Sequence, residues 1–310
     1  MAAITQDTPV GIVGGGLMGI GIATRFALAG FTTTVIETDP GRAGAISAGA
    51  DEILAQLAEA GRLDAAGRAA ALARLRVAHA LDALAGAGIV VEAIPESLEA
   101  KHGLYARLEA ILGADALIAS NTSGFPPDAL AAPLRHPERL LVAHFWNPPH
   151  LIPLVEVVPG SATDAAAVER TVALMRTIGA EPVVLKAAIP GFIGNRLQFA
   201  VLREALHIVR SGAADAETVD AVMKASLGRR WSIMGPFEGA DLGGLNTFLA
   251  ISEHLMPALA HDQDDLALLR EHVARGDTGA ASGQGFYTWD DARRDDVRAR
   301  RMRQLKAPDA

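Results

Sequence analysis

A histidine and a glutamate lie within one apolar, proline-rich stretch of the chain. Residues 143–158 read AHFWNPPHLIPLVEVV, which places Glu156 twelve positions (156 − 144) after His144. An imidazole titrates near neutral pH, and a carboxylate on its second nitrogen fixes the tautomer and stabilises the imidazolium. The pair therefore suits general acid–base chemistry, such as moving a proton off an alcohol. The competing interpretation is a hydrogen-bonded core histidine beside an ordinary edge charge, which is the more usual role of a lone histidine.

Composition and charge exclude several classes of protein. The chain has 310 residues, enough for two domains, and 50% of them are hydrophobic. The net charge of −8 argues against a nucleic-acid partner, and the basic run at 299–306 indicates a solvated helix face. There is no cysteine, which excludes disulfides, a thiolate nucleophile and a cysteine-ligated metal, and fits a cytoplasmic location.

No segment is expected to cross a membrane. The stretch 143–158 is long and apolar, but lipid cannot satisfy its prolines, Asn147 and Glu156. The N-terminus MAAITQDTPV lacks the basic and apolar regions of a signal peptide. No histidine pair has metal-site spacing with a supporting carboxylate, so we expect no metal. A small-molecule partner is compatible with these exclusions.

Short buried strands alternate with helical stretches over the first part of the chain. Strands are predicted at 10–15, 32–37, 88–94, 116–120, 140–145, 153–158 and 182–186. Between them, 17–29 has helical spacing, and 41–75 is predicted as two helices broken at Gly61, with Asp64 capping the second. The alternation predicts an α/β, Rossmann-like fold, a mostly parallel sheet with helices on both faces.

The pattern changes near residue 188. From Pro190 onward apolar residues recur at helical spacing and no strand is predicted. Pro190 and Gly191 are interpreted as the junction, with the proline at a helix start. We therefore predict a dinucleotide-binding domain over 1–187 and an all-α domain over 188–310.

A glycine cluster follows the first predicted strand and opens a helix. It fits G-x-G-x-x-G, with Gly14, Gly16, Leu17, Met18 and Gly19 as its positions. In this context the backbone N–H groups and the helix dipole can receive a pyrophosphate. The second strand ends at Glu37, whose carboxylate can hold both ribose hydroxyls of NAD and repel the extra phosphate of NADP. The alternative is a glycine-rich turn that binds nothing.

Five motifs in order give the chain a family resemblance. They are SNTSG (120–124), HFWNPPHLIPLVEVV (144–158), PGFIGNRL (190–197), MGPFEGADLGGL (234–245) and SGQGFY (282–287). In that order and at those intervals they resemble the 3-hydroxyacyl-CoA dehydrogenase family, from Val10 to about Trp289. The resemblance implies NAD-dependent oxidation of a 3-hydroxyl group and a homodimer formed through the helical domain.

The resemblance also implies a catalytic set. His144 matches the family's catalytic base and Glu156 its carboxylate partner. Ser123 and Asn195 match residues that bind the reacting oxygen, which makes them both catalytic and substrate-binding. Such donors polarise the carbonyl in the reverse direction.

Further matches concern the cofactor. Glu96, Lys101 and Asn147 match residues near the nicotinamide half of NAD. Ala93 matches a residue whose backbone passes close to the dinucleotide.

The substrate is less closely defined, because the sequence departs from the acyl-CoA pattern in two places. Residues 41–80 contain no lysine to meet CoA phosphates; the cations available there include Arg62, Arg68, Arg74 and Arg76. The stretch LGRRWSIMGP (227–236) places Arg230 where acyl-CoA enzymes have smaller, neutral residues. It is more similar to the branch acting on free hydroxy acids, with gulonate 3-dehydrogenase (the lambda-crystallin relatives), carnitine 3-dehydrogenase and a pyridine-carboxylate dehydrogenase. Arginine can clamp a carboxylate bidentately; the alternative is a surface salt bridge.

Other readings of the whole chain remain open. A dehydrogenase of the 3-hydroxyisobutyrate or 6-phosphogluconate type shares the glycine motif, but its catalytic lysine is missing from GFIGNRLQFAVLREA (191–205). A CoA thioester could be the substrate in place of a free 3-hydroxy acid. A crystallin-like structural protein or an NADH-binding sensor without turnover would belong to another class.

Overall fold

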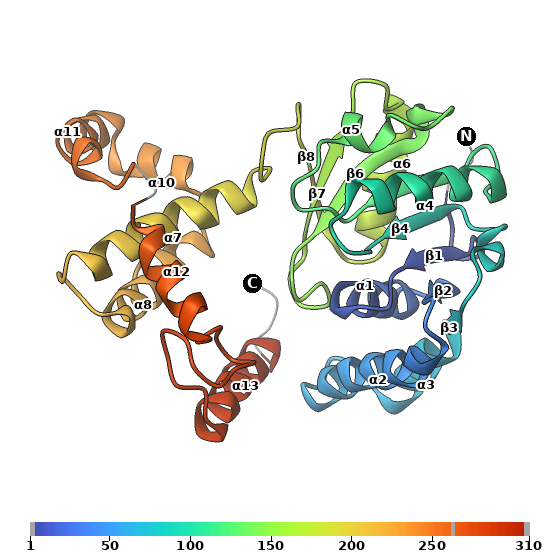
Figure 1. The fold of residues 1–310 in the computed structure, drawn as a ribbon, viewed down its shortest axis with the longest axis horizontal. Helices are drawn as coiled ribbons and strands as arrows, with labels where there is room; N and C mark the ends of the chain where they lie inside the picture. Colours follow the sequence, from blue (N-terminus) through green and yellow to red (C-terminus); the bar gives the residue numbers. More distant parts are fainter. Residues whose placement is uncertain (1–3, 262–263, 307–310) are drawn as a thin grey trace. The chain divides into compact units, whose positions relative to one another are not determined.

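One eight-stranded sheet forms the centre of the N-terminal part of the chain (Figure 1). The computed structural model describes residues 4–261 and 264–306. The strand order is β3-β2-β1-β4-β5-β6-β7-β8, and neighbours are parallel except for the antiparallel pair β6 and β7. The strands are β1 Val10–Val13, β2 Thr33–Ile36, β3 Leu75–Ala78, β4 Ile89–Glu92, β5 Leu117–Ser120, β6 Leu140–Phe145, β7 Leu154–Pro159 and β8 Glu181–Val184. The predicted Rossmann-like class is confirmed.

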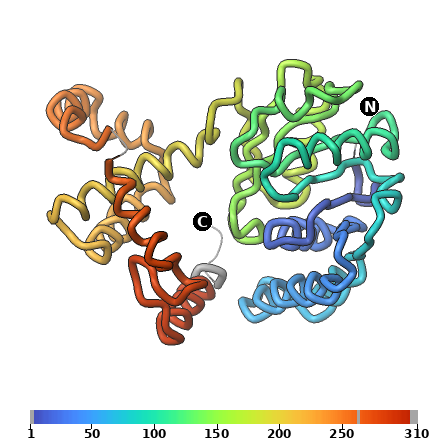
Figure 2. Tube along the Cα trace, viewed as in Figure 1, coloured from blue at the N-terminus to red at the C-terminus, as the bar shows by residue number. Residues whose placement is uncertain are grey.

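Helices cover both faces of this sheet. They are α1 Leu17–Leu28, α2 Ala43–Glu59, α3 Ala65–Arg74, α4 Leu98–Ile111, α5 Pro127–Ala131 and α6 Ala165–Thr177, with 3₁₀ turns η1 Pro40–Arg42, η2 Leu81–Leu84 and η3 Pro137–Arg139. The path from β2 through α2 and α3 to β3 can be followed in blue in Figure 2. Asp64 caps α3 by accepting a 2.7 Å hydrogen bond from the Gly67 N–H, so the predicted break and cap are confirmed.

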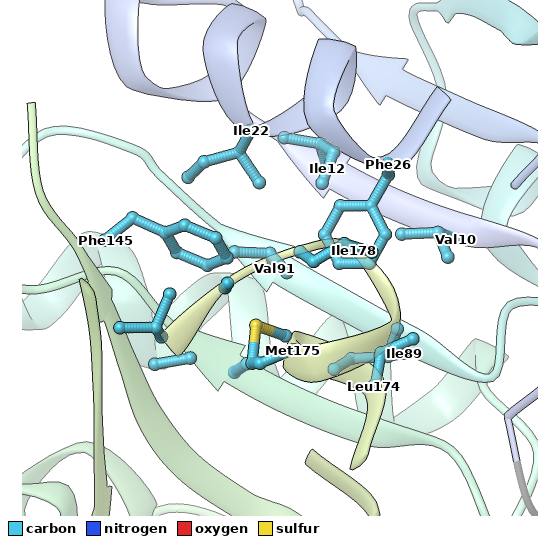
Figure 3. Close-up of a cluster of buried hydrophobic side chains, with 14 of the residues drawn as sticks. Val10, Ile12, Ile22, Phe26, Ile89, Val91, Phe145, Leu174, Met175 and Ile178 are labelled. Carbon is cyan, nitrogen blue, oxygen red and sulfur yellow. The ribbon is translucent and has the colours of Figure 1, made fainter. Parts of the chain in front are cut away.

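Two apolar clusters fill the space between the sheet and its helices. One contains residues of β1, β4, α1 and α6 together with Phe145 (Figure 3). The other includes Leu104, Tyr105 and Leu108 of α4. Central strands are buried on both faces, which explains why they appear in the sequence as continuous apolar runs. Side chains alternate between the two faces along a strand. Because Phe145 lies in the first cluster, the neighbouring His144 points to the opposite face of the sheet.

The C-terminal part is helical, as predicted. Its elements are α7 Gly194–Arg210, α8 Ala216–Ala225, α9 Leu227–Trp231, α10 Pro236–Gly243, α11 Leu245–Leu255, η4 Met256–Ala258, α12 Leu266–Arg275 and α13 Asp291–Lys306. The chain divides into two compact units, one ending at Ile193 and resumed at Arg300, the other spanning Gly194–Ala299. Within the described residues of the second unit, β-type pairing is limited to isolated antiparallel bridges that join Gln284 to Gly279 and to Thr288.

Several predicted bounds differ from the observed ones by one or two residues, and the clearest errors are at β3, β8 and Pro190. The helical segment 41–75 ends a residue early, because Leu75 opens β3, an edge strand that was not predicted. The short sequence LRVA continues the alanine-rich helical pattern and gives no separate signal. The last strand is Glu181–Val184 instead of 182–186. Pro190 does not start a helix: residues 190–193 form a turn, and α7 begins at Gly194.

Candidate active site

His144 and Glu156 face each other across neighbouring antiparallel strands. They are register partners on β6 and β7, and directly opposed side chains of such a pair project to the same face. The distance from His144 Nδ1 to Glu156 Oε2 is 2.9 Å, and the residues are 5% and 1% exposed. Because an ionised carboxylate only accepts hydrogen bonds, the neutral imidazole carries its proton on Nδ1 and has its lone pair on Nε2. The arrangement presents a basic nitrogen held from behind by a carboxylate.

Ser123 lies at the open side of the imidazole. Its Oγ is 3.2 Å from His144 Nε2. The loop after β5 is held in place by its own side chains: Asn121 Oδ1 accepts from the Phe145 N–H at 2.8 Å, and Thr122 Oγ1 accepts from the N–H groups of Gly124 and Phe125. A hydroxyl and a basic nitrogen are thereby fixed at one point, where an alcohol could be oriented and deprotonated.

Glu156 has further partners that fix its carboxylate. The indole N–H of Trp146 donates to Oε2 at 3.3 Å, and the backbone N–H of Ile193 donates to Oε1 at 2.9 Å. The ring of Phe192 packs 5.6 Å from the imidazole of His144, centroid to centroid. Sequence reasoning missed Trp146, Phe192 and the Ile193 N–H as parts of this site. Only Trp146 gave a signal, since it lies two residues after His144.

The glycine loop has the steric features of a dinucleotide cradle. A Cβ on Gly19 would lie 1.8 Å from the Gly14 carbonyl oxygen, and one on Gly14 would lie 2.5 Å from that of Ala93. Gly14 also has φ +109°, a conformation that favours glycine. A Cβ on Gly16 would meet no atom within 4 Å. Helix, strand and loop are thus packed closely, and open space remains at the middle glycine, where phosphates would approach the start of α1.

The remaining positions of the loop differ in exposure. Leu17 is 68% exposed at the first turn of α1, while Met18 packs against the core cluster. One of the two side chains therefore borders the solvent above the loop, and the other anchors the helix.

Glu37 follows β2 and lies beside the glycine loop. Arg42 donates from Nη1 to Glu37 Oε2 at 3.0 Å and from Nη2 to the Gly15 carbonyl at 2.9 Å. The Asp39 N–H donates to Glu37 Oε1 at 3.2 Å, and His79 Nδ1 lies 2.8 Å from the Glu37 carbonyl. A carboxylate at this place suits a ribose diol. The direct pairing with Arg42 was not foreseen, because the two residues are five positions apart in an irregular segment.

Lys101 is buried in a polar cluster around Glu92. Its ammonium lies 2.6 Å from Glu92 Oε1 and 3.2 Å from Glu96 Oε2, and its side chain is 1% exposed. Glu92 also accepts from the hydroxyls of Tyr105 at 2.6 Å and Ser120 at 2.7 Å. Burial, and then the charge of Glu92, raise the pKa of Tyr105, so its phenol stays protonated and donates. Glu92 was missed in the sequence because a lone carboxylate at a strand end gives no distinct pattern.

Glu96 and Asn147 complete the expected cofactor set in this unit. Glu96 accepts a hydrogen bond from the Thr122 hydroxyl, in the same loop that carries Ser123. Asn147 is exposed, three residues after His144.

The loop between β6 and β7 is fixed to α1 by Arg25. Its guanidinium donates to the carbonyls of Pro149 at 2.9 Å and Ile152 at 3.0 Å, and Nε donates to that of Ile178 at 3.0 Å. Burial lowers the pKa of Arg25. Burial also lowers the pKa of nearby His150, to about 4. His150 is therefore neutral at physiological pH. Arg25 gave no sequence signal, since it belongs to a helix otherwise recognised by its apolar spacing.

Asn195 and Arg230 belong to the helical unit. Asn195 lies in the first turn of α7 and is partly exposed, and Arg230 lies in the exposed helix α9. Within the described residues no carboxylate forms an ion pair with Arg230. The same part of the chain contains no group of three or more His, Cys, Asp or Glu that could hold a metal ion. Nor does it contain a helix with the length and apolar character needed to cross a bilayer.

Comparisons with known proteins identify the family of the chain. Residues 9–188 match the family model for the 3-hydroxyacyl-CoA dehydrogenase NAD binding domain, and residues 191–289 match that for the C-terminal domain. The chain therefore belongs to the 3-hydroxyacyl-CoA dehydrogenase family, whose members are NAD-dependent oxidoreductases. Its N-terminal unit is an NAD-binding domain.

Individual relatives differ in their named substrates. A 5-formyl-3-hydroxy-2-methylpyridine 4-carboxylate 5-dehydrogenase of Mesorhizobium japonicum is 33% identical over 96% of each chain. A solved structure of such an enzyme, described as an NAD⁺-dependent dismutase, has a TM-score of 0.85 at 32% identity, also over 96% of each chain. An L-carnitine dehydrogenase of Streptomyces coelicolor is 37% identical over 89% of this chain and 88% of its own. A probable 3-hydroxybutyryl-CoA dehydrogenase of Bacillus subtilis is 34% identical over 90% and 96%.

Proposed function

We propose that the protein catalyses the reversible oxidation of the 3-hydroxyl of a free 3-hydroxy acid to the ketone. The observation that carries the proposal is the His144–Glu156 pair, joined at 2.9 Å and with Nε2 of the histidine facing Ser123. NAD, when bound, supplies the acceptor for the hydride that leaves the substrate carbon. The hydroxyl proton must leave in the same reaction, and His144 Nε2 is the group that accepts it.

The roles of the other side chains follow from that proton transfer. Glu156 stabilises the positive charge that the imidazole gains. Ser123 orients the substrate oxygen, and we assign Asn195 to the same oxygen from its place in the family motif. In the reverse direction these donors polarise the ketone while His144 returns the proton.

For the cofactor, the glycine loop is assigned to the pyrophosphate and Glu37 to the adenosine ribose. Ala93, Glu96, Lys101 and Asn147 are assigned to the nicotinamide half. Because Lys101 is buried and paired with Glu92 and Glu96, it acts there by holding the Glu96 carboxylate in place.

Two features favour a free acid over a CoA thioester. Arg68, one of the few cations between β2 and β3, is already bound to Asp51 of α2, with N–O distances of 2.8 and 2.6 Å. Arg230 has no ion-pair partner among the described residues and is proposed as the clamp for the substrate carboxylate. Carboxylates are also named as substrates of the pyridine-carboxylate relative. The thioester is the second candidate, supported by the relative named 3-hydroxybutyryl-CoA dehydrogenase.

The first experiment is NAD reduction with a matched substrate panel. Gulonate, carnitine, 3-hydroxybutyrate and 5-formyl-3-hydroxy-2-methylpyridine 4-carboxylate would be compared with 3-hydroxybutyryl-CoA by kcat/KM. We expect a free acid to exceed the thioester by at least tenfold, and His144→Gln to lose turnover about 10³-fold or more while its NADH Kd is unchanged. Near-normal turnover of His144→Gln would overturn the base assignment. Tight NADH binding with no turnover of any panel member would favour a non-catalytic binder.

Arg230 has its own test. Arg230→Ala is expected to raise KM for the best free acid at least tenfold and to leave the constants for the thioester within twofold. The neighbouring Arg229→Ala is the matched control for loss of one positive charge in α9. Equal effects on both substrates would remove Arg230 from the site.

We also propose that the protein is a homodimer formed through its helical unit. Of the apolar side chains described in that unit, only Leu206 and Ala260 are buried in the single chain. Large exposed ones include Phe199, Ile233, Phe237, Leu242, Leu245, Leu249 and Met256. An exposed apolar surface of this kind marks an interface, and a second copy is the partner that the family membership favours. Sedimentation velocity at micromolar concentration tests it, and a monomer there contradicts it.

A further inference from the structure

The turn that ends the N-terminal unit carries an uncommon backbone conformation next to the candidate catalytic pair. Phe192 has φ +50°, in the left-handed region that bulky residues rarely adopt, and Gly191 before it has φ +77°. Among the described residues, Phe192 is the only one other than glycine that has a positive φ. Holding such a residue there costs about 1–3 kcal/mol, so the surrounding structure must impose it.

Two contacts connect this conformation to the His144–Glu156 pair. The side chain of Phe192 is 1% exposed, and its ring packs 5.6 Å from the His144 ring at an interplanar angle of 55°. The next backbone N–H, that of Ile193, donates to Glu156 Oε1 at 2.9 Å. The Ile193 side chain itself is 45% exposed, so it is the amide that turns inward. One residue thus packs against the imidazole and directs the amide that binds the carboxylate.

We propose that Phe192 is a positioning residue for the catalytic pair. Its left-handed backbone aims the Ile193 N–H at Glu156, and its ring packs at a tilt against the imidazole, so that Glu156 keeps His144 in the productive orientation. This inference rests on the proposed function of His144 as the base. It also gives a structural reason for the Gly191–Phe192 sequence. Glycine readily adopts the positive φ at position 191, and burial of the aromatic ring holds the positive φ at position 192.

The test is a double-mutant cycle in kcat with the full-length protein. Phe192→Ala removes the ring and is expected to lower kcat about 10²-fold, the scale of a mispositioned reacting group, with NADH Kd within twofold of wild type. Phe192→Leu keeps apolar bulk and should recover most of the loss. In a Glu156→Gln background, where the carboxylate is already lost, Phe192→Ala should lower kcat less than about threefold, because both changes act through one unit.

Matched controls separate positioning from general destabilisation. Leu185 belongs to the same apolar cluster as Phe192 and is 4% exposed. Leu185→Ala should lower the urea midpoint by a comparable amount and leave kcat within twofold. The pH dependence of kcat should shift in Phe192→Ala and not in Leu185→Ala, because only the former alters how the base is held.

The outcomes distinguish the two levels of inference. A full loss in both the wild-type and the Glu156→Gln backgrounds, or no loss in either, refutes the positioning role and leaves the base assignment intact, provided that His144→Gln is inactive. If His144→Gln turns over normally, the proposed function fails and the positioning role fails with it.

Discussion

Replacing Lys101 by methionine should expose how strongly the buried cluster depends on charge balance. The substitution keeps the apolar stem and removes an ammonium that lies 2.6 Å from Glu92 Oε1. Glu92 is 0% exposed and would be left in the interior as an uncompensated carboxylate. Removing one partner of a buried ion pair costs about 3–5 kcal/mol, because the remaining charge keeps its desolvation penalty.

The structure places the expected value at the lower end of that range. Glu92 still accepts hydrogen bonds from the Ile94 N–H at 2.8 Å, Tyr105 at 2.6 Å and Ser120 at 2.7 Å. Such charge-assisted bonds are worth about 1.5–3 kcal/mol each and partly replace hydration. We therefore expect Lys101→Met to lower the free energy of unfolding of the N-terminal unit by about 3 kcal/mol. The double variant Glu92→Gln/Lys101→Met should lose only about 1 kcal/mol, because it leaves no buried charge.

Urea unfolding followed by the fluorescence of Trp146 measures this in the right unit. Trp231→Phe and Trp289→Phe would be introduced into every variant, since both tryptophans belong to the helical unit. Additive losses in the Glu92/Lys101 cycle, within about 0.5 kcal/mol, would refute mutual charge compensation. So would a Lys101→Met loss below 1 kcal/mol.

Three further predictions concern the cofactor, pH and the loop after β6. Glu37→Gln should raise KM for NAD about tenfold and reduce discrimination against NADP, since Arg42 then faces a 2′-phosphate without a competing carboxylate; unchanged NADP/NAD ratios in kcat/KM would contradict this. The pKa of His150 falls to about 4 in the folded state, from about 6.5 unfolded, so the unfolded chain binds more protons and stability is lost as pH falls through 6.5 toward 4. Halved for partial exposure, the loss in free energy of unfolding between pH 7.5 and 5 is about 1 kcal/mol. Urea unfolding at the two pH values should show this loss in the wild type and not in His150→Gln. In Arg25→Lys, one ammonium cannot reach the several carbonyls that the guanidinium binds. We therefore expect a free energy of unfolding about 2 kcal/mol lower by urea unfolding and a kcat about tenfold lower. Wild-type values in both assays would show that the loop keeps its conformation without Arg25.

Local patterns predicted most of the fold. The buried strands of the sheet are continuous apolar runs bounded by glycine or proline, and the Asp64 cap has a local hydrogen bond to Gly67, so both are visible in the sequence. β3 was missed because an edge strand buries little and its four residues need no distinct pattern. The start of α7 was misplaced because Pro190 is a common first helical residue. The left-handed conformation of Phe192 depends on tertiary contacts.

The candidate site was predictable where its residues lie in motifs and not where distant segments meet. His144, Glu156 and Ser123 came from family motifs, and the structure places them in one hydrogen-bonded row. Arg25 lies 124 positions from the Pro149 carbonyl that it binds, and Lys101 reaches Glu92 from the next helix. Such contacts connect segments whose local sequence satisfies their own secondary structure, so nothing in either segment indicates the other.

The placement of the His144–Glu156 pair follows from the one reversal of strand direction within the sheet. In a parallel pair the inter-strand hydrogen bonds are evenly spaced but slanted, and the two strands need a long crossover connection. Because β7 returns antiparallel to β6, a loop of only eight residues, 146–153, brings Glu156 directly opposite His144. The same short loop supplies Trp146, whose indole N–H binds Glu156, and its carbonyls at Pro149 and Ile152 are held by Arg25. Strand register, the loop and the turn at Phe192 therefore all contact the His144–Glu156 pair, which we propose as the catalytic pair. A change that shifted β7 by one residue would turn Glu156 to the other face of the sheet and abolish the pair, even if every side chain of the candidate site were retained.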